Sequence, residues 1–477
     1  MKVESELAEF VCTLRVGDVP APAQRVLRQI TLAVCGTALA GAGEDGIDAL
    51  RSLLRERGGA PQATAFVFGE RLPAAAAARL NGTLCRALDY CDAMAPGPHI
   101  GSSLLPAALA AAELAGGCCG EEFVAALAAG AELSSRLNLS ESQYDGFDPT
   151  GVLVVFAATA AAARILRLTP SQTLHALALA FNRCGGSFQS NVDGTLAVRM
   201  VQGWVAETGV DCAQLAQRGV TGPSNFIGGH YGYAHLYGRG RFEVPGLARD
   251  LGHEWRLQRV VFKKYPSCGV TQGVTELALA MVAEDGLRAE QVASAVVRLP
   301  PYAHKLVGHA FRIGANPRVD AQFSAAYCVA NAVARRGSRL AHFAPAQVVD
   351  TAVQRLIERI DVVADATLDA RGHTAVDLEV RTADGRTLTR ALDIAPGFPG
   401  AGLSDAQHRA RFDDCAAYAP HPLPARQVDR LIAAIEGLAA LDDVRRLASL
   451  LTAPPHRSRP AGRRAQPSGG SSITWST

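Results

Sequence analysis

The stretch from residue 150 to residue 166 reads TGVLVVFAATAAAARIL and combines a continuous apolar run with a high alanine content. Alanine is the strongest helix former and allows helices to pack closely. The apolar part, residues 151–163, is broken by Thr159 and stopped by Arg164, whereas a membrane-spanning helix needs about 20 apolar residues. The stretch therefore predicts a buried helix of a globular protein, and we expect no membrane partner.

Similar alanine- and leucine-rich segments lie on both sides of this stretch. They cover residues 102–114, 121–137 and 171–180, and the last of them follows Thr169-Pro170, a pair typical of helix starts. Helical segments of this length with short Gly/Pro breaks between them are typical of an antiparallel bundle. We expect a helical domain over residues 1–262.

The pattern changes after Trp255, where strand signals begin to alternate with helical ones. Residues 294–299 have strand composition, and residues 376–380 and 388–394 flank the turn Asp384-Gly385, which predicts a β-hairpin. Helical patterns at 273–283, 321–335 and 348–360 lie between these strands. We therefore expect a smaller α+β lid domain over residues 263–399, while residues 400–451 complete the first domain. The predicted fold class is mainly α, a large all-helical bundle domain with a smaller α+β lid domain.

Charge is almost balanced along the chain. The 477 residues include 47 lysines and arginines and 45 aspartates and glutamates, a net charge of +2. Residues 452–477 contain arginines but no acidic residue, and they have too few apolar side chains to fold, so we expect a disordered basic tail. Because no basic face is indicated, nucleic acid is not an expected partner.

Cysteine usage and missing motifs narrow the class further. The eleven cysteines form no Cys-x-x-Cys pair, and the N-terminus lacks the order of a secretory signal, so we expect a reducing cytoplasmic location. The chain has no Gly-x-Gly-x-x-Gly after a strand, no Walker A motif, no Gly-x-Ser-x-Gly and no His-Glu-x-x-His. Nicotinamide, nucleotide and esterase chemistry therefore lose their usual sequence support.

The most polar break between the alanine-rich helices runs from Asp89 to His99. Asp89 and Asp92 are three residues apart, which places them on one helix face, and a Pro/Gly loop then leads to His99. An aspartate and a histidine that meet at a loop can orient each other for proton transfer. The alternative is a helix-capping aspartate beside a surface histidine. A magnesium site would need a second acidic cluster, which the helical region lacks, so we expect no metal.

Two further breaks carry polar residues. Tyr144 and Asp148 precede a helix N-terminus, where free N–H groups and the helix dipole suit an anionic substrate, although Asp148 could equally cap that helix. Lys263 and Lys264 lie where the two predicted domains meet, a place where pockets tend to form. They are candidates for a carboxylate clamp or a base, with an ordinary solvated lysine pair as the alternative.

Six motifs of the chain are characteristic when taken in their order. They are ALDY (87–90) with the following His99, DPTG (148–151), QGWVA (202–206), LAQRGVTGP (215–223), KKYPSC (263–268) and QFSAAY (322–327). Together they resemble the MmgE/PrpD family, which includes 2-methylcitrate dehydratase, cis-aconitate decarboxylase and iminodisuccinate epimerase. The resemblance covers nearly the whole chain to about residue 450. It implies a cofactor-independent enzyme, a homodimer, and an active site in the cleft between a helical domain and a smaller lid.

The resemblance also implies four catalytic residues, and the polar breaks add candidates for substrate binding. Expected catalytic residues are Asp89, His99, Lys263 and Tyr327. Expected substrate-binding residues are Asp92, Tyr144, Asp148, Arg199, Lys264 and Cys268. In this hypothesis His99, oriented by Asp89, transfers the proton, and Tyr144 or Tyr327 is a second acid. Lys263, supported by Lys264 or Arg199, binds the carboxylate and stabilises the developing enolate.

The chain departs from the family pattern at several of these positions. Asp148 replaces a histidine, Val198 replaces a lysine, and Ala93 replaces a threonine, while Cys268 and Gln272 stand where histidine occurs. These changes remove cationic partners, so we expect a smaller or less anionic acid than 2-methylcitrate.

The expected activity is that of a lyase that removes a proton next to a carboxylate or carbonyl of a small carboxylic acid, as a dehydratase or a decarboxylase. An epimerase, which is an isomerase, would use the same site and return the proton to the opposite face. A catalytically inactive binding member is the second alternative.

Overall fold

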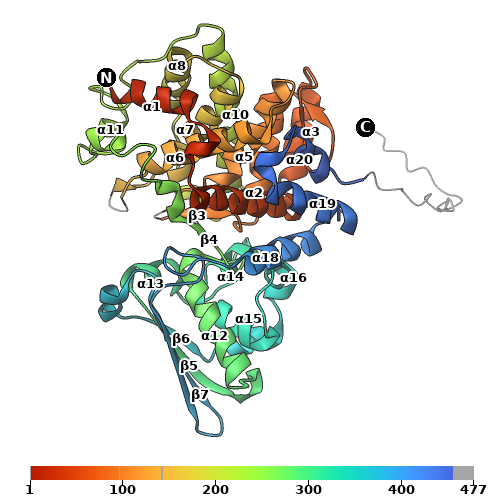
Figure 1. The fold of residues 1–477 in the computed structure, drawn as a ribbon. Coiled ribbons are helices and arrows are strands. Elements are labelled where there is room, and N and C mark those ends of the chain that lie inside the picture. The colour runs from red at the N-terminus through yellow and green to blue at the C-terminus, as the bar shows by residue number, and fades with distance from the viewer. Residues whose placement is uncertain (1, 96, 141–142, 455–477) are drawn as a thin grey trace, which may run out of the picture.

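The computed structural model describes residues 2–95, 97–140 and 143–454. The fold is mainly α, as the sequence predicts, and it has two parts. Figure 1 shows a helical part above a smaller part in which helices accompany a sheet.

The larger part is built from helices and two very short strands. Its elements are α1 (Val3–Thr13), α2 (Ala21–Gly41), α3 (Ile47–Arg57), β1 (Ala63–Thr64), β2 (Arg71–Leu72), α4 (Ala74–Arg86), α5 (Gly101–Leu114), α6 (Gly120–Leu137), α7 (Pro149–Ile165), α8 (Pro170–Phe181), α9 (Gln189–Val192), α10 (Ala197–Gln217), α11 (Tyr233–Leu236), α18 (Asp405–Tyr418), α19 (Ala425–Glu436) and α20 (Arg445–Leu451).

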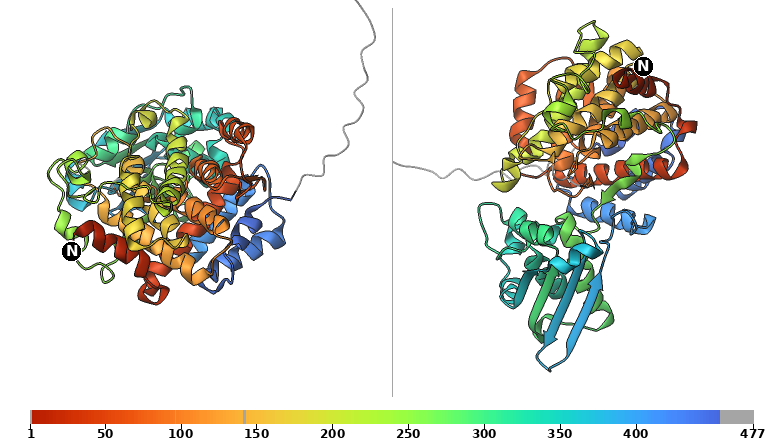
Figure 2. Two further views of the ribbon diagram at one scale, coloured as in Figure 1. Left: turned by 90° about the horizontal axis from the view of Figure 1, so that it is seen from above. Right: turned by 90° about the vertical axis from the view of Figure 1, so that its left-hand side faces the viewer.

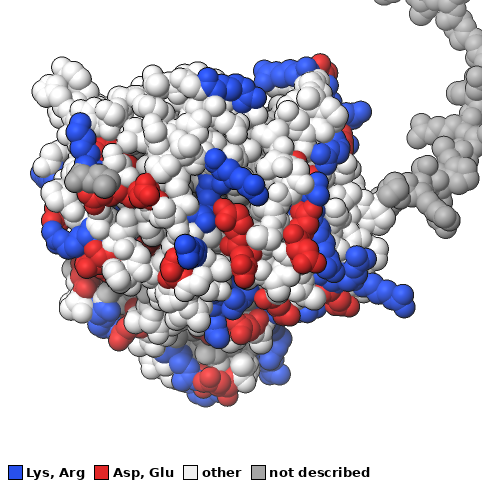
Figure 3. Space-filling view, turned by 45° about the horizontal axis from the view of Figure 1, so that its top comes forward, with Lys and Arg blue, Asp and Glu red and all other residues white. Residues whose placement is uncertain are grey.

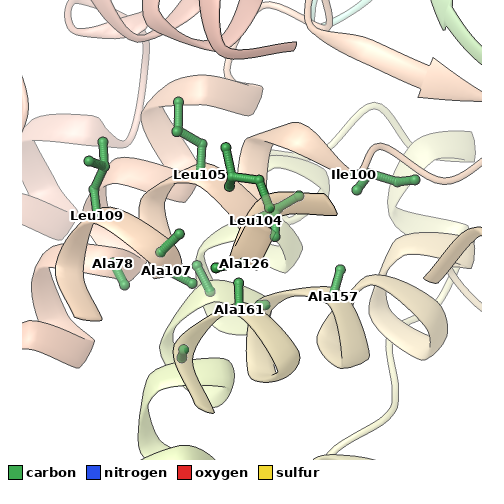
Figure 4. Close-up of a cluster of buried hydrophobic side chains, with 14 of the residues drawn as sticks. Ala78, Ile100, Leu104, Leu105, Ala107, Leu109, Ala126, Ala157 and Ala161 are labelled. Atoms are coloured by element: carbon green, nitrogen blue, oxygen red, sulfur yellow. The ribbon is translucent and has the colours of Figure 1, made fainter. Parts of the chain in front are cut away.

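Helix α7, which contains residues 150–165 of the alanine-rich stretch, lies at the centre of this part. All of its residues are buried, and it packs against α5, α6, α8 and α10. Figure 4 shows alanines of α7, such as Ala157 and Ala161, among leucines and alanines of the neighbouring helices. Small side chains let these backbones approach closely, so the alanine-rich composition becomes tight helix packing.

The contact between α7 and α10 depends on a glycine. A Cβ atom on Gly209 would lie 2.6 Å from the Cβ of Ala158 and 2.7 Å from its carbonyl carbon. Gly209→Ala is therefore expected to force the two helices apart and to lower the free energy of unfolding by roughly 1–3 kcal/mol, despite the better helix propensity of alanine. Denaturant unfolding measures the change. Gly17→Ala, which would meet no atom within 4 Å, is the control, and equal stability of both variants would contradict the packing argument.

The smaller part contains a four-stranded sheet. Its elements are α12 (Gln272–Glu284), β5 (Val292–Leu299), α13 (Pro301–Val307), α14 (Pro317–Gln322), α15 (Ala325–Arg335), α16 (Pro345–Val348), α17 (Thr351–Ile357), β6 (Ile360–Ala364), β7 (Val376–Thr382) and β8 (Thr387–Leu392). The strand order is β6-β5-β7-β8, with β6 parallel to β5 and the other pairs antiparallel. Helix α12 packs on β7 and β8, and α15 packs on β6; the right-hand view of Figure 2 shows the sheet beside its helices. A second apolar cluster fills the space between them.

Several boundaries differ from the sequence expectations. The predicted helix 321–335 is two helices, because α14 ends at Gln322 and the Ser324 hydroxyl caps the start of α15. The predicted helix 348–360 is also divided, because Asp350 caps the start of α17, and its end leads into β6, a strand that was not predicted. The predicted hairpin is present as β7 and β8, and Gly385 adopts φ +89° in its turn.

The two parts meet at a short ladder. Strand β3 (Asp92–Met94) pairs antiparallel with β4 (Val260–Phe262), and the C-terminal helix α18 lies next to this junction and packs on α2. The apolar cluster of the helical part includes residues up to Phe262 and residues from Phe412 to Leu451, whereas the cluster of the smaller part begins at Cys268.

The first two residues assigned to the predicted tail, Thr452 and Ala453, contact the helical part. Thr452 pairs with Val67, and the Ala453 N–H donates to the Val67 carbonyl oxygen over 2.9 Å. Residues 455–477, to which most of that prediction applies, lie outside the described residues.

The surface shows no large field of one charge sign on the face in Figure 3, where basic and acidic side chains alternate. Among the described helices, none has the length and apolar character needed to cross a membrane.

Candidate active site

Asp89 lies just after α4 in a backbone conformation that is rare for a residue with a side chain, with φ +52°. Its carboxylate accepts a bond of 2.6 Å from Arg86 Nη1 and lies 2.8 Å from Lys263 Nζ, which also donates to the Asp89 backbone oxygen over 2.7 Å. Burial alone would raise the pKa of Asp89, but the charges of Arg86 and Lys263 hold this pKa well below its usual range. Asp89 is therefore a fixed negative charge between two cations.

His99 lies on the other side of the same carboxylate. Its Nδ1 is 2.7 Å from the backbone carbonyl oxygen of Asp92, while its Nε2 is 3.7 Å from Asp89 Oδ1. Because a carbonyl oxygen only accepts, Nδ1 carries the proton and Nε2 keeps a free lone pair. The Asp92 carbonyl therefore orients the imidazole, instead of the Asp89 carboxylate that the sequence analysis proposed.

The environment of His99 keeps its ring neutral. Burial lowers the pKa of His99 to about 3, and the nearby charge of Arg86 contributes in the same direction. At neutral pH the side chain is thus an unprotonated base whose lone pair needs no prior deprotonation.

A small recess with a free volume of about 40 Å³ lies next to His99. Its polar lining residues are Arg86, His99, Asp148, Thr150, Asn191 and Gln202, and its other lining residues are Gly97, Pro149, Phe188, Val198 and Val201. The resemblance implied a site between two domains, but every lining residue belongs to the helical part. Strand β4 reaches this region by delivering Lys263 to Asp89.

The N-terminus of α7 lines the recess with Pro149 and Thr150, and His99 immediately precedes the start of α5. The Asp92 carboxylate accepts from the N–H groups of Ile100 and Gly101 at the start of α5. Asp148 Oδ1 accepts from the N–H groups of Thr150 and Gly151 at the start of α7. Both carboxylates are helix caps, which was the alternative interpretation of these aspartates.

Gln202 of α10 joins the two helix starts. Its side-chain amide donates to the backbone oxygen of His99 over 3.2 Å and to the Thr150 hydroxyl over 3.1 Å. The Thr150 hydroxyl in turn accepts the His99 N–H over 3.2 Å. These bonds fix the backbone of His99 on both sides of its side chain.

The structure brings together three of the four predicted catalytic residues, and it places Tyr327 elsewhere. The Tyr327 hydroxyl donates to the His342 carbonyl oxygen over 2.6 Å, and its ring packs against Phe311 and Phe343 in the core of the smaller part. Tyr327 makes no described contact with Asp89, His99 or Lys263, so its catalytic role stays a prediction without geometric support.

Most of the predicted substrate-binding residues also have other partners. Lys264 Nζ lies 2.7 Å from the Glu276 carboxylate of α12. Arg199 donates to the backbone oxygen of Asp45, and the Tyr144 hydroxyl donates to Asn138. Cys268 is buried, its N–H donates to the Gln322 carbonyl oxygen, and burial raises the pKa of its thiol. Of the six, only Asp148 lines the recess.

Comparisons with known proteins identify the chain. The model of the MmgE/PrpD N-terminal domain matches residues 5–244, and that of the MmgE/PrpD C-terminal domain matches residues 265–436. The chain belongs to the MmgE/PrpD family. The resemblance stated from its motifs is thereby confirmed.

Curated members of the MmgE/PrpD family are similar to this chain along most of its length. A cis-aconitate decarboxylase-like protein of Aspergillus oryzae is 24% identical over 94% of this chain and 97% of its own length. The cis-aconitate decarboxylases of Homo sapiens and Mus musculus are 26% and 25% identical, each over 80% of this chain and 80% of their own length.

Sequence reasoning missed two polar residues of this MmgE/PrpD site. Arg86 ends α4, where an arginine ordinarily serves as a solvated charge at a helix C-terminus, yet only 8% of it is exposed. Its position three residues before Asp89 was the available signal. Gln202 belongs to the motif QGWVA (202–206). That its amide bonds to both His99 and Thr150 depends on the packing of α10 beside α5 and α7.

The low pKa of His99 predicts a specific pH dependence of stability. Between pH of about 6.5 and about 3 the unfolded His99 binds a proton that the folded His99 rejects, so the free energy of unfolding falls as the pH falls through this window. Denaturant unfolding at a series of pH values should show a shallower slope in His99→Gln than in the parent protein. Equal slopes would contradict a neutral, buried His99.

Proposed function

We propose that this MmgE/PrpD protein is a cofactor-independent lyase that removes a proton next to a carboxylate or carbonyl of a small carboxylic acid. The observation that carries the proposal is His99: a neutral base, fixed on both ring and backbone, with a free Nε2 beside a recess that contains an arginine. The names of its relatives support a decarboxylase or dehydratase type of reaction.

Substrate binding in this proposal uses Arg86. Arg86 donates a hydrogen bond from Nη1 to Asp89 and lines the recess. Its other nitrogen atoms can therefore bind a substrate carboxylate in the bidentate geometry that guanidinium groups favour. A carboxylate bound there places the adjacent carbon near the imidazole.

Proton abstraction then needs stabilisation of the enolate that forms. His99 Nε2 takes the proton, and Arg86 and Lys263 supply positive charge in a site where little water screens it. Asp89 holds these two cations in place and stabilises the imidazolium that His99 becomes. With a leaving group on the next carbon, the enolate collapses to an alkene, which is dehydration. With an unsaturated carboxylate, proton transfer followed by loss of CO₂ is decarboxylation.

Exchange with solvent deuterium tests the proposal. The protein is incubated in D₂O with a panel of mono-, di- and tricarboxylic acids that includes cis-aconitate, and each acid is analysed by NMR. Deuterium at the carbon next to a carboxylate, or a product formed from it, supports proton abstraction. Racemisation without a lyase product would identify the epimerase alternative. Binding of an acid with neither exchange nor product would identify an inactive binding member. The homodimer implied by the resemblance stays a prediction, which light scattering checks.

A further inference from the structure

The recess has an unusual balance of charge for a site that binds acids. Among its described lining residues Arg86 is the only lysine or arginine, and Asp148 is the only carboxylate. The nearby Lys263 is bonded twice to Asp89, which is also the partner of Arg86. The Asp89 carboxylate therefore neutralises one of its two cations, and the remaining positive charge can balance a single substrate carboxylate.

Besides Arg86 and His99, the lining has an apolar part and a carboxylate. Val198, Val201 and the half-exposed Phe188 are apolar. Asp148 is 6% exposed, and its Oδ1 accepts both cap bonds from α7. The Asn191 side chain also bonds to this carboxylate, so a donor group of a ligand would use the acceptor capacity that remains on Asp148.

A second substrate carboxylate would find no second lysine or arginine among the described lining residues. It would lie against the aliphatic side chains or against Asp148, and an unpaired or like-charged carboxylate in a poorly hydrated site is strongly disfavoured. A hydrogen-bond donor such as a hydroxyl or ammonium group would instead be bound by Asp148. The free volume of the recess, about 40 Å³, is far below that of ligand pockets, roughly 300 Å³ or more, which favours a short chain.

We propose that the recess selects a short monocarboxylate that carries a hydroxyl or ammonium group, with its carboxylate on Arg86, its donor group on Asp148 and its apolar part against Val198 and Val201. This specificity rests on the proposed function, because it assigns a substrate class to the same site. It makes Asp148 and Val198 specificity-determining residues, and it separates this chain from enzymes that act on acids with two or three carboxylates.

Binding of three four-carbon acids tests the proposal by calorimetry. Butyrate has one carboxylate, 3-hydroxybutyrate adds a donor group, and succinate adds a second carboxylate. We expect 3-hydroxybutyrate to bind roughly tenfold more tightly than butyrate, because one good hydrogen bond to a charged group contributes about that much. Succinate is expected to bind most weakly. Succinate binding as tightly as 3-hydroxybutyrate would overturn the proposal, as would no binding of any of the three.

Two variants test the roles of Asp148 and Val198. Asp148→Asn keeps an oxygen for the helix cap but removes the charge, and it is expected to erase the preference for 3-hydroxybutyrate over succinate. Val198→Lys adds a cation, and it is expected to raise the affinity for succinate at least roughly tenfold. Val349→Lys adds the same charge at a position that is 53% exposed and outside the recess, and it should change nothing. If Asp148→Asn does not fold, Val198→Lys alone tests the proposal. An unchanged affinity of Val198→Lys for succinate would contradict it.

Deuterium exchange at C2 of each acid separates this inference from the proposed function. The expected binding order without exchange would leave the specificity standing and reject proton abstraction. Exchange that is fastest with succinate would support proton abstraction and reject the specificity.

Discussion

Replacing His99 with glutamine is expected to slow deuterium exchange by roughly 10²–10⁴-fold, the usual contribution of a positioned general base. Glutamine has a similar size, and its amide can still donate to the Asp92 carbonyl oxygen, but it has no lone pair basic enough to take a proton from carbon. Because His99 contacts the substrate only through Nε2 in the proposed mechanism, the loss should lie in kcat more than in KM.

An exposed histidine provides the matched control for this variant. His309 lies on the surface of the smaller part, and His309→Gln should exchange at the parental rate. Exchange by His99→Gln within about threefold of the parent would mean that another group is the base, and the mechanism proposed above would be rejected.

Replacing Lys263 with methionine is expected to have the second large effect, on stability as well as on rate. Lys263 is 4% exposed and bonded to both the carboxylate and the backbone oxygen of Asp89. Removing one partner of a buried ion pair costs roughly 3–5 kcal/mol, and here it also removes a charge that stabilises the enolate. We expect a lower free energy of unfolding and at least a roughly 10²-fold slower exchange.

A double variant separates the two effects of Lys263. In Lys263→Met the Asp89 carboxylate keeps Arg86 as its partner, whereas adding Asp89→Asn leaves the buried Arg86 charge unpaired, so the double variant should be less stable than Lys263→Met while the exchange rate stays low in both. Lys264→Met is the neighbouring control, because the Lys264 ammonium is bound to Glu276. If the double variant regained both stability and rate, Lys263 would be a structural residue only.

The sequence predicted the helices around the site more accurately than the directions of their side chains. The stretch 150–166 agrees with α7 to within one residue at each end, because alanine-rich composition and a proline at the first turn are local signals. Tyr327 was placed correctly in a helical segment, but only tertiary packing decides that its ring enters the core of the smaller part. The face of a helix that meets a pocket cannot be read from composition.

The approach of Asp89 to Lys263 shows a second limit. These residues are 174 positions apart, and only the family motifs suggested that they meet. The ladder that joins their segments, β3 with β4, has three residues in each strand, too few for an alternating pattern to be recognised. Arg86 was overlooked for a related reason, since its burial is produced by partners far away in the sequence.

The β3–β4 ladder has a practical consequence for exchanging parts between members of this family. The Asp92 carbonyl oxygen in β3 binds the His99 ring, and Lys263 directly follows β4. The ladder therefore positions both the imidazole of His99 and the ammonium group of Lys263. A chimera that takes its smaller part from a relative should keep residues up to Lys263 with the helical part. A crossover before residue 260 would replace β4 with the strand of another protein. A crossover after Lys263 would leave His99, Asp89 and Lys263 in their native alignment.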